Sequence, residues 1–131
     1  ATIAATHHFW CRFEDQDRGS GAGGGLLVAG VQPVVGDPIQ ISEGTGSVTI
    51  TANLIQGNNA GTGDGGGLLL QTINGLDVLA SPLNSSTWYH VELFNNIIVN
   101  NVAGLAGGGI AMQDVAMVKM INNTVAHNDS T

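Results

Sequence analysis

The chain has 131 residues and a net charge of −7, because it contains ten acidic residues against three basic ones, Arg12, Arg18 and Lys119. A nucleic acid or an anionic membrane requires a patch of Lys and Arg, so neither is expected as a partner, and polyanionic substrates are disfavoured for the same reason. The apolar content of 43% is too high for a disordered chain, while 20 glycines and frequent Asn indicate a turn-rich, all-β fold. No apolar run approaches the roughly 18 residues of a membrane span, and the single cysteine excludes an internal disulfide.

The N-terminal stretch is interpreted as a degenerate first copy of a repeat. The segment THHFWCRFEDQDRG lies 42 positions before VTITANLIQGNNAG, which places Cys11 under Asn53 and Phe13 under Ile55. We therefore expect residues 1–18 to form a first coil and cap, whose aromatic side chains cover the coil end that has no neighbour. In this alignment Cys11 replaces a turn Asn, so we expect a buried, reduced and unreactive thiol.

Three glycine triplets follow at a constant spacing. They are Gly23–Gly25, Gly65–Gly67 and Gly107–Gly109, 42 residues apart in both intervals, and each precedes an apolar run, LLVAG, LLLQT or IAMQD. A strand after the glycines excludes a phosphate loop, which would open a helix. The triplets instead predict tight turns where neighbouring backbones approach closely, each followed by a strand.

A second repeated element has the pattern VxΦxxNxΦxxN, in which Φ is apolar. It occurs at residues 48–61, 91–104 and 118–131, and alternation of apolar and polar residues at its start predicts a strand. Its Asn residues occupy two equivalent positions in each copy, namely Asn53, Asn96 and Asn123 at the first and Asn58, Asn101 and Asn128 at the second. Asn tolerates left-handed backbone in turns, and stacked Asn side chains can bond to one another as ladders. We expect all six to be structural.

Two coils carry insertions of about 15 residues. The Val strands of the second repeated element begin 43 residues apart at Val48 and Val91, but only 27 apart at Val91 and Val118. The extra residues are 31–46 and 73–89, at equivalent points of neighbouring coils. Equivalent insertions of a solenoid emerge on one side, which is often the binding side.

The segments NNIIVNN, AGGGI and INNTVAHND resemble the Asn-rich repeats of right-handed parallel β-helix proteins of the pectate-lyase-like superfamily, particularly secreted or surface-anchored bacterial members. The resemblance covers residues 45–131 well and residues 6–44 loosely. It implies an all-β, right-handed parallel β-helix (solenoid) of about three to four coils with two inserted loops, and an extracellular or cell-surface location. We expect residues 1–131 to be a single β-helix domain and a fragment of a longer solenoid. The fold carries lyases, hydrolases, adhesins and passive modules, so it leaves the activity open.

Metal binding has two weak candidates in the sequence. Asp64 precedes the second glycine triplet and could bind calcium, but a calcium β-roll repeats its Asp, and the matching positions hold Ala22 and Ala106. The N-terminal stretch gathers potential ligands without any zinc spacing, namely His7, His8, Cys11, Glu14, Asp15 and Asp17. The favoured interpretation is structural in both places, and no cofactor is expected.

Catalytic and binding candidates lie near residue 90. Glu92 and His90 could act as acid and base, although a surface ion pair of Glu92 with Lys119 is the simpler interpretation. Trp88 and Tyr89 could stack on sugar rings, or could pack the inserted loop onto its coil.

Two function classes remain. The favoured one is a non-catalytic β-helix module of a secreted or surface protein, serving as scaffold, adhesion surface or weak glycan binder with a polysaccharide ligand. The alternative is a carbohydrate-active enzyme, a polysaccharide lyase or glycoside hydrolase, or a fragment of one. The last coil would also leave its main-chain edge open, which predicts a homo-oligomer formed through coil ends.

Overall fold

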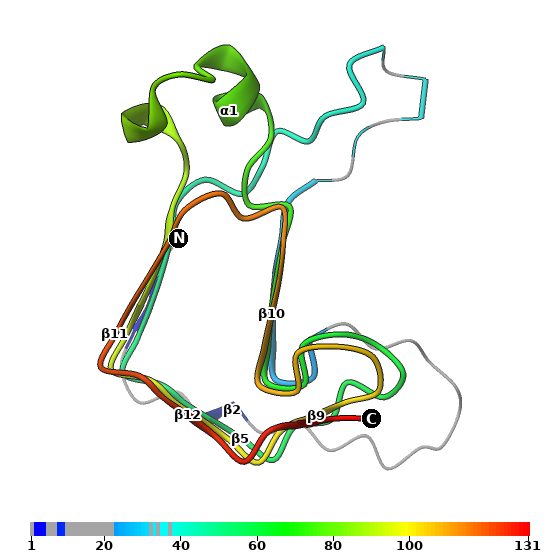
Figure 1. Ribbon diagram of the computed structural model, residues 1–131, viewed down its shortest axis with the longest axis vertical. Coiled ribbons are helices and arrows are strands. Elements are labelled where there is room, and N and C mark those ends of the chain that lie inside the picture. The colour runs from blue at the N-terminus through cyan, green and yellow to red at the C-terminus, as the bar shows by residue number, and fades with distance from the viewer. Residues whose placement is uncertain (1, 5–7, 10–22, 32, 34, 37) are drawn as a thin grey trace.

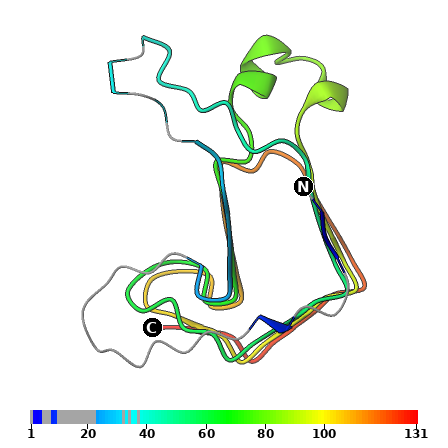
Figure 2. The same ribbon diagram turned by 180° about the vertical axis from the view of Figure 1, so that it is seen from behind.

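The computed structural model describes residues 2–4, 8–9, 23–31, 33, 35–36 and 38–131, which wind into a solenoid of stacked coils (Figure 1). In that view the chain turns counterclockwise while it advances from the blue N-terminal coil at the back to the red C-terminal coil at the front. Figure 2, seen from behind, has the blue strands nearest to the viewer. The solenoid is therefore right-handed.

Three parallel sheets run along the solenoid axis. The first consists of β1 (Thr2–Ala4), β4 (Val48–Thr51), β7 (Val91–Phe94) and β11 (Val118–Ile121). The second consists of β2 (His8–Phe9), β5 (Leu54–Gln56), β8 (Ile97–Val99) and β12 (Thr124–Ala126). The third consists of β3 (Leu26–Ala29), β6 (Leu68–Gln71) and β10 (Ile110–Gln113), and a short ladder joins β9 (Val102–Ala103) to β13 (Asp129–Ser130). Every pairing of these strands is parallel, so the prediction of an all-β parallel β-helix is confirmed.

The strand register agrees with the repeat alignment from β3 onwards. Val91 pairs with both Val48 and Val118, and Leu68 pairs with both Leu26 and Ile110. Alternate residues of each strand therefore point into the solenoid and form columns of equivalent apolar side chains. The fully buried members are Val48, Ile50, Ile55, Leu68, Leu70, Ile73, Val91, Leu93 and Ile98. These columns are the core.

The glycine triplets occupy places where neighbouring coils leave no room for a side chain. A Cβ atom at Gly66 would collide with the carbonyl oxygens of Gly108 and Val102, and Gly66 N donates to Gly107 O at 3.1 Å. The close approach of coil backbones explains why the triplet recurs in the first three coils.

The first coil corrects the alignment of the N-terminal stretch. Phe9 pairs with Ile55 and Ile3 pairs with Ile50, so the strands begin four to five residues earlier than a 42-residue spacing predicts. The prediction that Phe13 lies under Ile55 is therefore wrong. The prediction applied the 42-residue spacing of the glycine triplets to the strands of the first coil. It failed because the first coil has a longer segment between its second strand and its glycine triplet. Cys11 lies outside the described residues.

The left-handed turn residues are not the ladder residues themselves. Ala52, Asn95 and Asn122 have φ values of 54° to 58° and immediately precede Asn53, Asn96 and Asn123. The next corner repeats the arrangement, with positive φ at Gly57, Asn100 and His127. The sharp turn is thus made one residue earlier than expected, and the following Asn is free to point inward.

The inward Asn side chains form two ladders. Asn53 Nδ2 donates to Asn96 Oδ1 at 3.1 Å, and Asn96 Nδ2 donates to Asn123 Oδ1 at 2.9 Å. The second ladder has the same geometry, through Asn58, Asn101 and Asn128. The side-chain oxygens of Asn96, Asn101, Asn123 and Asn128 also accept the backbone N–H of the Asn in the preceding coil. The ladders therefore tie consecutive coils together at both corners.

Both inserted segments leave the solenoid at the same corner, beyond the upper end of β10 in Figure 1. The described residues of 31–46 form no helix or strand. Residues 73–89 contain α1 (Leu76–Ala80) and η1 (Ser85–Thr87). Among the described residues, no helix has the length and apolar character required to cross a membrane.

Replacing Asn96 by Leu tests the ladder. Asn96 is 1% exposed, and its loss would leave the amide of Asn53, Oδ1 of Asn123 and the carbonyl of Ile50 without their partner. We expect Asn96→Leu to lower the free energy of unfolding by about 1 to 3 kcal/mol, measured by urea denaturation. The matched control is Asn100→Gly, because Asn100 is exposed and its φ of 55° suits glycine, so a change within about 0.5 kcal/mol is expected. Equal effects of the two variants would contradict the ladder.

Candidate functional site: a pocket at the insertion side

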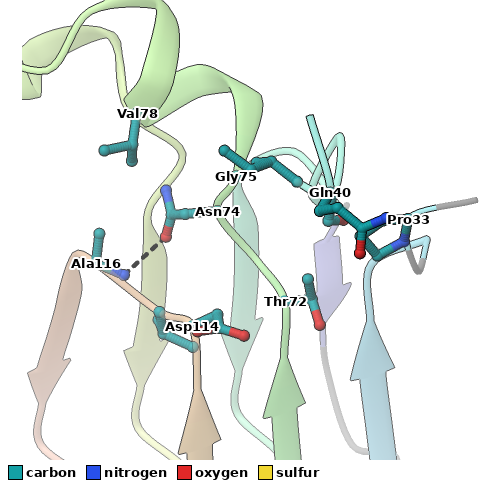
Figure 3. Close-up of a pocket in the computed structure, with 11 residues that line it drawn as sticks. Pro33, Gln40, Thr72, Asn74, Gly75, Val78, Asp114 and Ala116 are labelled. Carbon is teal, nitrogen blue, oxygen red and sulfur yellow. Dashed lines mark hydrogen bonds between the residues drawn. The ribbon is translucent and has the colours of Figure 1, made fainter. Parts of the chain in front are cut away.

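A pocket of about 690 Å³ opens at the corner where both insertions leave the solenoid. It is lined by parts of three successive coils (Figure 3), namely Pro33, Gln40, Ile41, Ser42, Thr72, Asn74, Gly75, Val78, Asp114, Val115 and Ala116. Small-molecule sites commonly have volumes of roughly 300 to 1,000 Å³ and combine apolar walls with a few polar groups. This pocket has both properties.

Three lining residues have the left-handed backbone that also makes the other corners of the solenoid. Gln40, Thr72 and Asp114 all adopt left-handed conformations, with φ of 53°, 54° and 53°. Thr72 is β-branched and 8% exposed, and a β-branched residue with positive φ is a true outlier. Strain at such a residue costs about 1 to 3 kcal/mol, so the surrounding contacts must compensate for it.

Asn74 joins the second insertion to the following coil. Its backbone N–H donates to Asp114 O at 3.1 Å, and its Oδ1 accepts the N–H of Ala116 at 2.7 Å, the dashed line in Figure 3. Its Nδ2 donates to Asp77 Oδ2 at 2.7 Å and to Tyr89 O at 2.8 Å. The amide is 6% exposed and fully engaged, so Asn74 shapes the pocket wall.

Ser42 joins the two insertions to each other. Its hydroxyl donates to Val31 O at 2.5 Å and accepts the N–H of Gly44 at 3.0 Å. Its carbonyl accepts the N–H of Leu76 at 2.9 Å, at the start of α1. Ser42 is buried and its hydroxyl is already used at both ends, so it also serves the structure of the pocket.

Asp77 closes the base of the second insertion. Its carboxylate accepts the backbone N–H groups of Gly75 and Tyr89, both at 2.7 Å, in addition to the Asn74 amide. Partial burial by itself raises the pKa of this carboxyl. The hydrogen bonds from Tyr89, Gly75 and Asn74 outweigh that effect and hold the pKa of Asp77 below its ordinary value.

Asp114 differs from the other polar lining residues. It is the only ionisable side chain among the described lining residues, and it is exposed. Within the described part of the chain, no hydrogen bond or ion pair to its carboxylate is found. Its main chain is held by Asn74, so the position is fixed while the carboxylate can meet a ligand.

The predicted sugar platform lies beside the pocket and does not line it. Trp88 is half-buried, and its Nε1 donates to Ser81 O at 2.8 Å within the same insertion. The Tyr89 ring packs partly against the core cluster and lies next to Gly44 of the other insertion. These contacts match the packing interpretation of the two aromatic residues, and sugar binding by either of them stays a prediction.

His90 and Glu92 lie on the outer surface of the first sheet. Ser47 Oγ lies 3.1 Å from His90 Nδ1, and Glu92 is in register with Thr49 and Lys119. No ion pair joins Glu92 to Lys119 among the described residues, and the Lys119 amine lies 5.5 Å from the centroid of the Phe94 ring. Neither candidate lines the pocket.

The predicted metal ligands are not brought together in the described structure. Asp64 Oδ2 accepts Gln113 Nε2 at 2.9 Å, while Oδ1 is buried without a partner. One carboxylate falls short of the six to eight oxygens that calcium takes. No group of three His, Cys, Asp or Glu side chains suited to a metal occurs in the described part of the chain. His7 and Cys11 lie outside the described residues, and His8 is described only as part of β2.

The sequence predicts that any glycan binding uses the insertion side, which stays a prediction; the pocket opens on that side, but its residues were not predicted. The sequence did contain a usable signal. Thr72 and Asp114 occupy the same position, directly after the strand that follows a glycine triplet. The insertion begins after Thr72, whereas the coil of Asp114 has no insertion. No family model, curated protein or solved structure matches the chain. The site therefore has to be interpreted from its own geometry.

Asp77 provides a pH test of the insertion. Its folded-state pKa lies below the unfolded value, so its stabilising contribution is present above about pH 4 and is lost as the pH falls through the folded pKa. We expect Asp77→Asn to lower the melting temperature at pH 7 and to have a smaller effect as the pH falls through the folded-state pKa of Asp77, since the wild-type carboxylate then becomes protonated and loses its charge as well. Amide exchange at Gly75 and Tyr89 should accelerate in the variant. Asp129→Asn, at an exposed position of β13, is the control and should leave both amides unchanged. An effect of Asp77→Asn that is independent of pH would contradict the proposed role of the charge.

Proposed function

We propose that this chain is a non-catalytic β-helix module of a secreted or surface protein, of the pectate-lyase-like type, and that it binds a glycan in the pocket between its two insertions. The observation that carries the proposal is the pocket itself. It combines apolar walls from Pro33, Ile41, Val78 and Val115 with polar groups, and hydrogen bonds of Ser42 and Asn74 hold the segments that form it. Its volume suits a short oligosaccharide segment.

The electrostatics favour binding over catalysis. Glycoside hydrolysis requires two carboxyl groups on opposite sides of the scissile bond. The described lining supplies one, Asp114, and the nearby Asp77 carboxylate is engaged by three donors and has a lowered pKa, which is unsuitable for a general acid. The favoured function is therefore recognition. Release of reducing ends or unsaturated products from a polysaccharide panel would instead support the enzyme alternative.

The test of the glycan site compares two neighbouring positions on α1. Val78 lines the pocket, whereas Leu79 is 51% exposed and does not line it. For an oligosaccharide selected by glycan array, we expect Val78→Trp to fill the pocket and weaken binding about tenfold or more in isothermal titration calorimetry. Leu79→Trp should bind like the wild type.

Two results would contradict this placement. Equal binding by both α1 variants would move the site away from the pocket. Loss of binding in Trp88→Ala, with Val78→Trp unaffected, would move it to the aromatic residues.

We further propose that a second copy of the chain covers the last coil. The inward-facing residues of β11 and β12 correspond to buried residues of earlier coils, yet Val118, Met120 and Val125 are 39%, 44% and 47% exposed. An open strand edge with an apolar face is a template for pairing. This proposal concerns the chain of 131 residues in isolation.

Light scattering across a concentration series tests the association. We expect a mass above that of one chain at high micromolar concentration, and a shift to the monomer in Met120→Lys, because a charge would be buried between the copies. Leu83→Lys, at a fully exposed position of the insertion, should leave the mass unchanged. A strictly monomeric wild type would refute the proposal.

A further inference from the structure

We infer that the pocket selects glycans that carry an ammonium group, and that the carboxylate of Asp114 recognises this group. The inference rests on the glycan-binding function proposed above and names the chemical class of the ligand. It depends on which polar groups of the pocket are still available, on the charge around the pocket, and on the rigidity of the Asp114 backbone.

The buried polar side chains of the pocket wall are already engaged. The Ser42 hydroxyl bonds to Val31 and Gly44, and the Asn74 amide bonds to Asp77, Tyr89 and Ala116. A ligand could bond to them only by breaking contacts that hold the insertions. The Asp114 carboxylate has no such contact among the described residues. A ligand can therefore engage this carboxylate without breaking a contact that holds the insertions.

The two inserted segments that flank the pocket are acidic in sequence. The inserted segments 31–46 and 73–89 contain Asp37, Glu43 and Asp77 and no Lys or Arg. The one Lys or Arg side chain in the described part of the chain is Lys119, whose amine lies over the Phe94 ring of the first sheet. A uronic acid would bring its carboxylate towards Asp114 without a compensating cation. An amino sugar would form a charge-assisted hydrogen bond there.

The carboxylate stands on a rigid base. Asp114 adopts φ of 53°, which Asp tolerates better than most residues, and its carbonyl and the N–H of Ala116 are both bonded to Asn74. Thr72 holds the equivalent position in the preceding coil and is uncharged. The pocket therefore presents one negative charge at a defined place, and recognition of one ammonium needs little reorganisation.

Three oligosaccharides of matched length test the inference. They are an oligomer of glucosamine, an oligomer of N-acetylglucosamine with the same linkage but no charge, and an oligomer of galacturonate. At pH 6, where the amine is charged, we expect the glucosamine oligomer to bind the intact chain about tenfold more tightly than the N-acetylated one, and the galacturonate oligomer to bind most weakly. The preference should shrink as salt rises from 0.05 to 0.5 M, because exposed charges are screened.

Two variants assign the preference to Asp114. Asp114→Asn keeps a residue that tolerates the left-handed backbone and removes the charge, so we expect the glucosamine preference to disappear while neutral binding persists. Asp114→Gly removes the carboxylate without backbone strain and serves if the Asn variant does not fold. Glu43→Gln is the matched control, since Glu43 is an exposed carboxylate of the insertion that does not line the pocket, and it should keep the preference.

The outcomes separate this inference from the function on which it rests. Equal affinity for the glucosamine and N-acetylglucosamine oligomers would overturn the inference and leave glycan binding intact. Binding of none of the three, and of no other glycan in the array, would overturn the proposed function. A preference that survives in both Asp114 variants would overturn the assignment to Asp114.

Discussion

Parallel main-chain pairing between coils is the constraint on which the rest of this structure depends. It sets equivalent residues of consecutive coils about 4.8 Å apart, so each position of the repeat becomes a column. A column must be occupied by residues that tolerate a copy of themselves at that distance. Apolar side chains satisfy this in the core, Asn amides satisfy it by bonding to one another, and Gly66 satisfies it where the backbone of Gly108 leaves no space. The composition of the chain follows from this requirement.

The insertions interrupt this pairing and must satisfy their backbone in another way. Residues 73–89 have no coil of equal length above them, because the next coil turns directly from Asp114 to Val118. Side chains and local turns therefore accept several of their backbone N–H groups, and the Asp77 carboxylate accepts those of Gly75 and Tyr89. Asn74 in turn accepts from the shorter coil. A difference in coil length thus produces both the opening of the pocket and the polar groups that hold it open.

Repetition explains what could be predicted from the sequence. The core columns, the glycine turns and the inward Asn positions each recur, so register follows from alignment, and the all-β parallel solenoid was predicted correctly. The first coil was misaligned because its spacing is not that of the others, as the pairing of Phe9 with Ile55 shows. The pocket could not be predicted from periodicity. It depends on contacts between non-repeated segments, such as Ser42 with Leu76, for which a repeat pattern holds no information.

The corner after the third sheet is a place where ligand specificity can arise in this fold, because the repeat fixes its backbone but leaves its side chain variable. At the corner after the third sheet, Thr72 and Asp114 share the left-handed conformation, so the backbone is the same whichever side chain stands there. The residue at this position can therefore change its charge without changing the turn. On such a scaffold, function depends on the side chains placed at a backbone geometry that recurs from coil to coil, and main-chain pairing maintains that backbone geometry. A single carboxylate stands at this corner in the third coil, and no basic residue of the insertions opposes it.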